Sequence, residues 1–332
     1  MKSDATHWQP SAALDNWIPV QLKRVDSDLL CEWLFTGEKA FAEPFFDQTI
    51  AACRFATTRN RQYKVLSALE MMVQWSDDSV ALPLSAVVFH VSRCGSTLLA
   101  QLLAEDERHL VLSEVPFFDE LLRLPLQQPT INAASAENAL CAALAFYGRQ
   151  RQQNQQYLLI KTDSWHLHFY RQYRRLFPGV PFFLLYRHPL EVIRSQQKQR
   201  GLQSVPGMLE PQIFGFANDQ HHPTDLDQYM AAVLESYFEK MIYICENDPL
   251  AIPLNYASGM LTLIKKVYAH LGSHLDNQLK ERFVQRCRFH AKRPQQLFTG
   301  KQQQQPVPPY LERAMALYAQ LEAISAAMPE VP

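Results

Sequence analysis

The 332-residue sequence lacks any apolar run near 20 residues and begins with the polar stretch MKSDATHWQP, so we expect neither a membrane-spanning helix nor a signal peptide. Its six cysteines form no C-x-x-C pair and no spacing typical of a disulfide framework. This pattern is typical of proteins from a reducing compartment. It also lacks a charge excess, because 32 Lys and Arg residues face 33 Asp and Glu residues. Neither nucleic acid nor a membrane is therefore expected as a partner, and a cytoplasmic protein is predicted.

One segment, AVVFHVSRCGSTLL at 86–99, combines a short apolar strand, a tight polar loop and an apolar helix. Such a junction directs free backbone N–H groups and the positive end of the helix dipole to one point, which suits a phosphate or sulfate group. Arg93 adds a positive charge, and Gly95 lets the backbone approach an anion closely. We therefore look for group transfer from a nucleotide, with candidate binding residues Ser92, Arg93, Cys94, Gly95, Ser96 and Thr97.

The loop lacks the lysine of a kinase-type phosphate loop. When the second glycine of G-x-x-x-x-G-K-[ST] is placed on Gly95, His90 occupies the first glycine position and Ser96 the lysine position. Only Thr97 fits the pattern. A P-loop kinase or NTPase is therefore the weaker alternative, and a serine-rich helix N-terminus without a ligand is a second one.

The rest of the chain predicts an α/β fold. Apolar runs at 109–112, 157–161, 181–187 and 250–256 predict strands, and helical apolar spacing recurs at 167–176, 190–199, 226–246, 259–271 and 275–288. This alternation favours a P-loop-like parallel sheet of about five strands with helices on both faces and ligands at the carboxyl ends of the strands.

Residues 1–80 are predicted to form a mixed α/β N-terminal extension of unknown role, and residues 81–332 the P-loop-like domain. In the extension we expect a strand over 16–24 and helices over 28–35, 44–54 and 64–74. A loop over 199–222 is long enough to lie over a site, and the connector KQQQQPVPP at 301–309 precedes a last helix near 310–328.

Several polar side chains follow predicted strands. Arg187 ends one strand, and Ser195 lies two helical turns later, so the pair can bind a second anion. Lys161 can neutralise charge on a leaving-group oxygen. Glu114 can accept the proton of an acceptor hydroxyl.

Together these residues resemble the sulfotransferase superfamily, whose donor is 3′-phosphoadenosine 5′-phosphosulfate, and the layout is closest to its protein-tyrosine sulfotransferase branch. Residues 92–97 look like the family's 5′-phosphosulfate loop, and Arg187 and Ser195 look like the pair that holds the 3′-phosphate. The resemblance covers roughly residues 83–300. It implies in-line transfer of a sulfuryl group from this co-substrate to a hydroxyl or amine of a small molecule or peptide, without a metal.

The sequence departs from that pattern at the proposed base. Soluble members carry a histidine where this chain has Asp163, so the base is either Glu114 or Asp163. Tyr256 and Lys301 resemble further donor contacts of the family only loosely. A non-catalytic nucleotide-binding protein on the same fold is a further alternative. Neither the acceptor nor the oligomeric state follows from the sequence.

Two further features of the sequence concern metal binding and thiol reactivity. His166 and His168 begin a helical stretch in which their side chains diverge, and no zinc-type spacing accompanies them, so no metal site is expected. Cys94 lies in an electropositive loop, which is expected to lower the pKa of its thiol.

Overall fold

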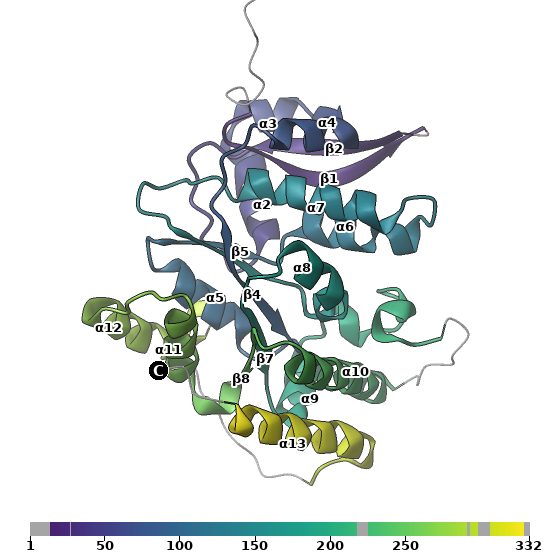
Figure 1. The fold of residues 1–332 in the computed structure, drawn as a ribbon, viewed down its shortest axis with the longest axis vertical. Coiled ribbons are helices and arrows are strands. Elements are labelled where there is room, and N and C mark those ends of the chain that lie inside the picture. Colours follow the sequence, from purple (N-terminus) through teal and green to yellow (C-terminus); the bar gives the residue numbers. More distant parts are fainter. Residues whose placement is uncertain (1–13, 27, 218–224, 291–292, 298–305, 329–332) are drawn as a thin grey trace, which may run out of the picture.

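A five-stranded parallel sheet forms the centre of the protein, in the order β5-β6-β4-β7-β8 (Figure 1). The computed structural model describes residues 14–26, 28–217, 225–290, 293–297 and 306–328. The observed sheet confirms the predicted fold class, and its strands lie where apolar runs predicted them: β4 (Leu84–His90), β5 (His109–Ser113), β6 (Tyr157–Lys161), β7 (Phe182–Tyr186) and β8 (Ala251–Asn255).

The strands are apolar because both faces of the sheet are covered. All five residues of β7 are buried, as are all five of β5. A parallel sheet covered on both faces has continuous apolar strands rather than alternating ones. Figure 1 shows helices on both sides of the sheet. On one side lie α5 (Ser96–Ala104), α11 (Met260–His270) and α12 (Asn277–Arg286), and on the other lie α8 (Tyr170–Leu176) and α10 (Leu226–Asn247).

Strand register brings the carboxyl ends of the strands together at one edge. Ser113 of β5 is paired with Lys161 of β6, and His90 of β4 with Leu185 of β7. The residues that follow these strands, including Glu114, therefore meet at a single edge of the sheet.

The described part of the N-terminal region is an antiparallel sheet of order β1-β2-β3 with the short helices α2, α3 (Thr58–Gln62) and α4. The strand predicted at 16–24 is confirmed as β1 (Trp17–Val25), and the helix at 44–54 as α2 (Phe46–Ala56). The helix expected over 28–35 is wrong, because this segment is β2 (Asp28–Phe35), which forms a hairpin with β1. The stretch 64–74 starts as β3 (Val65–Ala68) and only then becomes α4 (Leu69–Ser76).

The error at 28–35 has a physical cause. The apolar residues of LLCEWLF are compatible with either a helix or a strand that is buried on both faces. Pairing with β1 on one side and β3 on the other decides for the strand, and four consecutive residues, Cys31 to Leu34, are buried. Tertiary context has overridden local spacing here.

The N-terminal sheet shares one hydrophobic core with the rest of the chain. It packs on α6 (Pro116–Gln127) and α7 (Ala133–Tyr147), two helices in a stretch for which the sequence predicted no element. The Trp33 and Phe146 ring centroids are 4.9 Å apart, and the Tyr147 hydroxyl donates a hydrogen bond to the carbonyl oxygen of Pro19. The described residues between 14 and 80 are thus packed against the rest of the described chain in one hydrophobic core.

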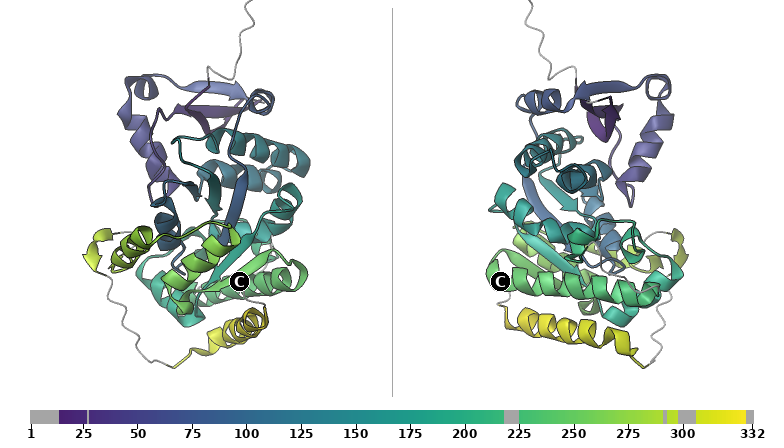
Figure 2. Two further views of the ribbon diagram at one scale, coloured as in Figure 1. Left: turned by 60° about the vertical axis from the view of Figure 1, so that its left-hand side comes forward. Right: turned by 90° about the vertical axis from the view of Figure 1, so that its right-hand side faces the viewer.

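The C-terminal part covers the β8 side of the sheet. Helix α13 (Glu312–Ala327) confirms the predicted last helix and lies along α10 (Figure 2). The hairpin of β9 (Phe289–His290) and β10 (Arg293–Leu297) precedes the connector, and Lys301, a predicted donor contact, lies outside the described residues. Among the helices described, none is both apolar enough and long enough to cross a bilayer.

Candidate functional site

The loop between β4 and α5 has the backbone geometry of an anion cradle. Ser92, Arg93 and Gly95 have φ values of 65°, 50° and 88°, all in the left-handed region. A tight turn can gather backbone N–H groups into a concavity that binds anions, and here the turn leads into the N-terminus of the nine-residue helix α5. The sequence predicted this junction, and the structure has it.

Gly95 is required for a more specific reason than the one predicted. A Cβ atom at this position would lie 2.5 Å and 2.7 Å from two ring carbons of Tyr256. The ring therefore closes over the loop, and the positive φ disfavours a side chain independently.

Arg93 and Arg187 meet at this loop, although 94 residues separate them. The Arg187 Nη1 atom donates a hydrogen bond of 3.1 Å to the Arg93 carbonyl oxygen, and the Arg93 Nε atom donates one of 2.8 Å to the Ser195 hydroxyl. The Arg187 guanidinium lies 4.6 Å from the centroid of the Tyr256 ring and donates a 2.6 Å hydrogen bond to Glu191. Burial and the neighbouring Arg187 lower the pKa of Arg93, so two positive charges converge where an anion would relieve their repulsion.

Three buried polar side chains hold Ser92 in place. Its N–H donates a 3.0 Å hydrogen bond to His90 Nδ1, which leaves the proton of this imidazole on Nε2, 2.9 Å from the Thr162 carbonyl oxygen. Gln196 and Gln203 both donate hydrogen bonds to the Ser92 hydroxyl, at 3.2 Å and 2.7 Å. Burial lowers the pKa of His90 and keeps the ring neutral.

Sequence reasoning did not identify these three supporting residues. In the sequence, His90 stands only where a kinase-type loop has its first glycine, and Gln196 and Gln203 belong to no motif. Gln203 belongs to the loop predicted over 199–222, and residues 199–203 of that loop line the cavity described below. Burial of the Gln203 amide and its hydrogen bond to Ser92 arise only in the folded chain, so no local pattern in the sequence predicts them.

Glu114 and Lys161 form an ion pair at the other end of the site. The Lys161 ammonium donates to Glu114 Oε1, and the backbone N–H of Glu114 donates a 2.7 Å hydrogen bond to the Lys161 carbonyl oxygen. Glu114 has a φ of 51°, a rare conformation for a non-glycine residue that is often found at functional sites. Burial raises the pKa of Glu114, but the Lys161 ammonium and the His90 ring outweigh burial and lower it.

Lys161 is 1% exposed and is not among the residues that line the cavity. Its predicted contact with a leaving-group oxygen therefore stays a prediction. The structure shows instead that the Lys161 ammonium forms an ion pair with Glu114.

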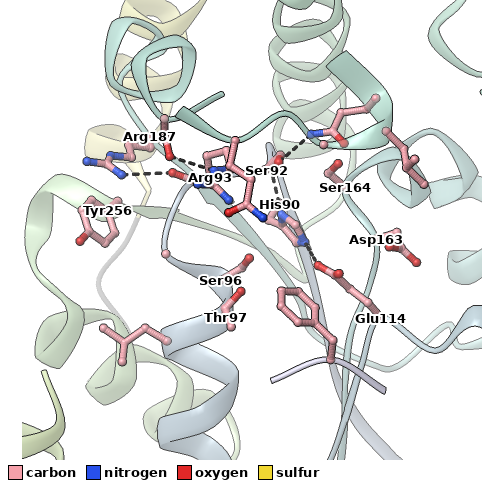
Figure 3. Close-up of a pocket in the computed structure, with 18 of the residues that line it drawn as sticks. His90, Ser92, Arg93, Ser96, Thr97, Glu114, Asp163, Ser164, Arg187 and Tyr256 are labelled. Carbon is pink, nitrogen blue, oxygen red and sulfur yellow. Dashed lines mark hydrogen bonds and ion pairs between the residues drawn. The ribbon is translucent and has the colours of Figure 1, made fainter. Parts of the chain in front are cut away.

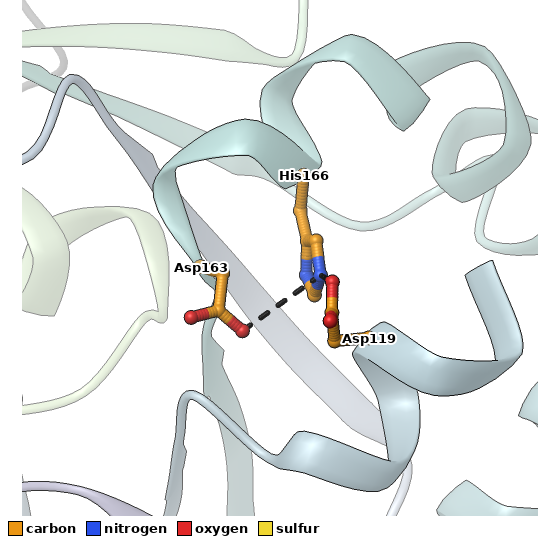
Figure 4. Close-up of side chains that lie close together, drawn as sticks. All are labelled: Asp119, Asp163 and His166. Atoms are coloured by element: carbon orange, nitrogen blue, oxygen red, sulfur yellow. Dashed lines mark hydrogen bonds and ion pairs between the residues drawn. The ribbon is translucent and has the colours of Figure 1, made fainter. Parts of the chain in front are cut away.

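Asp163 lies beside a small hydrogen-bonded cluster (Figure 4). His166 Nε2 is 3.0 Å from Asp119 Oδ1 and 3.7 Å from Asp163 Oδ2. Burial raises the pKa of Asp163 well above its usual range, and the carboxylates of Glu114 and Asp119 raise it further.

These three side chains place ligand-type atoms within 4.8 Å of one another, which is close enough for a metal ion. The Asp119 oxygens, however, already accept hydrogen bonds from Trp165 Nε1 at 2.5 Å and from Arg123 Nη1 at 2.8 Å, besides the His166 contact. A carboxylate held by three donors, one of them a guanidinium, is a poor ligand for a cation. We therefore interpret the cluster as a hydrogen-bonded support for the cavity wall.

A cavity of about 550 Å³ joins the two ends of the site. Figure 3 shows Arg187, Arg93 and Tyr256 on one side of it and Glu114 and Asp163 on the other, with Ser96 and Thr97 between them. The structure thus brings together most of the predicted site residues, and it adds Phe45 of the N-terminal region, which no motif pointed to. The predicted residues that line the cavity are Ser92, Arg93, Gly95, Ser96, Thr97, Glu114, Asp163, Arg187, Ser195 and Tyr256.

Cys94 does not line this cavity. Its side chain is fully buried, and burial raises the pKa of the thiol to about 11. The expectation of a lowered thiol pKa is wrong, because desolvation of the thiolate outweighs the nearby positive charges of Lys161 and Arg187.

Comparison with known proteins gives distant matches only. No protein-family model matches the chain, and no curated protein does. Among solved structures, sulfotransferase STF9 from Mycobacterium avium shares 14% identity at a TM-score of 0.46, over 78% of this chain and 79% of that one. The sulfotransferase domain of the curacin biosynthetic pathway shares 15% identity at a TM-score of 0.45, over 76% of this chain and 100% of that one. Sulfotransferase STF1 from Mycobacterium tuberculosis shares 10% identity at a TM-score of 0.40, over 65% of this chain and 76% of that one. At these scores the likeness carries no argument about function.

Proposed function

We propose that this protein is a sulfotransferase that moves a sulfuryl group from 3′-phosphoadenosine 5′-phosphosulfate to an acceptor hydroxyl or amine. One observation carries the proposal. A left-handed backbone cradle and two arginines form one end of a cavity whose other end holds an ionised carboxylate. Such a cavity suits a polyanionic donor at one end and a proton-releasing acceptor at the other.

The basic end provides for two anionic groups. The loop that follows Ser92 and the α5 N-terminus suit the 5′-phosphosulfate, and Ser96 and Thr97, whose hydroxyls can orient it, line the cavity. Arg187 and Ser195 suit the 3′-phosphate. This second anion would distinguish the donor from ATP, and the absence of a lysine at position 96 weighs against a kinase.

In the reaction, the acceptor oxygen attacks sulfur and the bond from sulfur to the bridging oxygen breaks. The bond's electron pair stays on the departing adenosine 3′,5′-bisphosphate. Glu114 accepts the acceptor proton, since its carboxylate is ionised and faces the cavity. Lys161 holds the Glu114 carboxylate in position through their ion pair. Positioning and charge stabilisation provide most of the catalysis in a transfer with a loose transition state.

Asp163 is the second candidate for the base. Its raised pKa makes it the stronger proton acceptor of the two carboxylates once it is ionised, and it also lines the cavity. We assign the role to Glu114, because Lys161 and His90 lower the pKa of its carboxyl group, whereas burial and the nearby carboxylates raise the pKa of Asp163 and disfavour its ionised form. Substitution of Glu114, described below, separates the two assignments.

Thermal unfolding with added nucleotide tests the proposal. Adenosine 3′,5′-bisphosphate at 100 times its Kd should stabilise the protein by about 2.7 kcal/mol, while ATP with Mg²⁺ should not. Stabilisation by ATP with Mg²⁺ alone would favour a kinase or NTPase. A response to neither nucleotide would contradict nucleotide binding altogether. Stabilisation by the bisphosphate without transfer of label from the sulfated donor to any component of a metabolite extract would favour a non-catalytic binding protein.

A further inference from the structure

The acidic end of the cavity carries more negative than positive charge. Lys161 balances Glu114 in a direct ion pair. Arg123 is shared between Asp119 and Glu210, at 2.8 Å and 2.7 Å.

No lysine or arginine in the part of the chain that the structure describes forms a direct ion pair with Asp163. Among the described residues, its ion-pair partner is His166 at 3.7 Å, and that imidazole is already hydrogen bonded to Asp119 at 3.0 Å. Asp163 nevertheless opens onto the cavity, where a bound molecule can reach it.

Two aromatic side chains line the same end. The Trp165 indole N–H bonds to Asp119 within the cluster that supports Asp163. The Phe45 ring lies 5.3 Å from the Lys161 ammonium, and so lies near the Glu114 ion pair. The face of an aromatic ring attracts cations, and a carboxylate beside such rings is a common arrangement for recognising an ammonium group.

We propose, on the basis of the proposed sulfuryl transfer, that the acceptor carries a cationic nitrogen beside its reacting group. Asp163 binds that nitrogen, and the rings of Phe45 and Trp165 contact the carbon skeleton and the cation. The reacting hydroxyl or amine then faces Glu114. A cation at this position stabilises the ionised form of Asp163, which burial disfavours, whereas a neutral acceptor provides no such stabilisation and an anionic acceptor is repelled by the carboxylates of Glu114 and Asp119.

Three small probes that differ in charge test this proposal. They are phenethylamine, 2-phenylethanol and phenylacetate, which share a ring and differ in the polar group. Binding of each is measured by calorimetry at pH 7, with and without adenosine 3′,5′-bisphosphate. We expect phenethylamine to bind about tenfold more tightly than 2-phenylethanol, since it adds a charge-assisted hydrogen bond and a cation–π contact, and phenylacetate to bind most weakly.

Substitutions at Asp163 locate the effect. Asp163→Asn should reduce the preference for phenethylamine over 2-phenylethanol to about equal binding, and Asp163→Glu should keep it, because the charge is retained. Asp78→Asn, which removes an exposed carboxylate outside the cavity wall, should change nothing. Melting curves establish that each variant folds.

Equal binding of the two probes to the wild-type protein, or an unchanged preference in Asp163→Asn, would overturn the proposal. Because the probes are also titrated without nucleotide, the test of the acceptor class does not depend on the sulfotransferase assignment. Failure of adenosine 3′,5′-bisphosphate to bind would contradict the assignment alone, whereas loss of charge selection with intact nucleotide binding would contradict only the acceptor class.

Discussion

The two ends of the cavity are built in different ways. The basic end is largely one continuous loop, residues 92–97, completed by Arg187 and Ser195 from one neighbouring strand–helix unit. The acidic end is assembled from four separate places in the chain: Phe45, Glu114, residues 161–166 and Asp119. A short contiguous motif suffices where backbone N–H groups bind an anion. A set of carboxyl groups whose pKa values are shifted by their neighbours requires side chains from several helices and strands to lie close together.

The largest expected effect concerns the chemistry at the acidic end. Glu114→Gln removes the proposed proton acceptor while keeping its size, and should lower the rate of sulfuryl transfer by about 10² to 10⁴. Transfer is measured with labelled donor, and the affinity for adenosine 3′,5′-bisphosphate should stay within about twofold, because the basic end is untouched. Near-full activity would assign the base to Asp163, in which case Asp163→Asn should show the large loss instead.

The next effect tests the basic end. Arg187→Ala should weaken binding of adenosine 3′,5′-bisphosphate by about 10-fold to 100-fold, since a charged hydrogen bond contributes roughly 1.5–3 kcal/mol. Adenosine 5′-phosphosulfate, which lacks the 3′-phosphate, should be affected much less. Arg61→Ala, at an exposed arginine of the N-terminal region, is the control for charge. Equal losses for both nucleotides would show that Arg187 does not recognise the 3′-phosphate.

A backbone change addresses the shape of the loop rather than its charge. Gly95→Ala should destabilise the fold by about 1–3 kcal/mol, because it combines a left-handed φ with a clash against the Tyr256 ring. Gly179→Ala is the matched control, since a Cβ there meets nothing within 4 Å. Unfolding in urea gives both free energies. Adding Tyr256→Ala should recover only the part due to the clash, and complete recovery would mean that the φ of Gly95 carries no strain.

The smallest effect is a pH dependence at the acidic end. Because the pKa of Asp163 is raised in the folded protein, the folded state binds more protons than the unfolded state above the unfolded pKa of about 3.9. The free energy of unfolding therefore falls as pH rises from there through the folded pKa. Asp163→Asn lacks this loss. Its free energy of unfolding, relative to that of the wild-type protein, should therefore be higher near pH 8 than near pH 4. Parallel curves of melting temperature against pH for the two proteins would contradict the raised pKa.

Local sequence was enough for the central fold. The strands at 109–112, 157–161 and 181–187 were predicted because a sheet covered on both faces requires uninterrupted apolar runs. The N-terminal hairpin was predicted only in part, since the apolar spacing at 28–35 fits a helix as well as a doubly buried strand.

The residues themselves thus determined the strand–loop–helix junction at 86–99, the parallel sheet and which charged groups stand at strand ends, because each of these depends on neighbours within a few positions. Tertiary structure alone decided which of those groups share a cavity and in what state. Strand register set Glu114 against Lys161, burial reversed the expected shift in the pKa of Cys94, and packing of the N-terminal region brought Phe45 to the site. Desolvation and charge pairing depend on distances between residues far apart in the chain, and those distances exist only after folding.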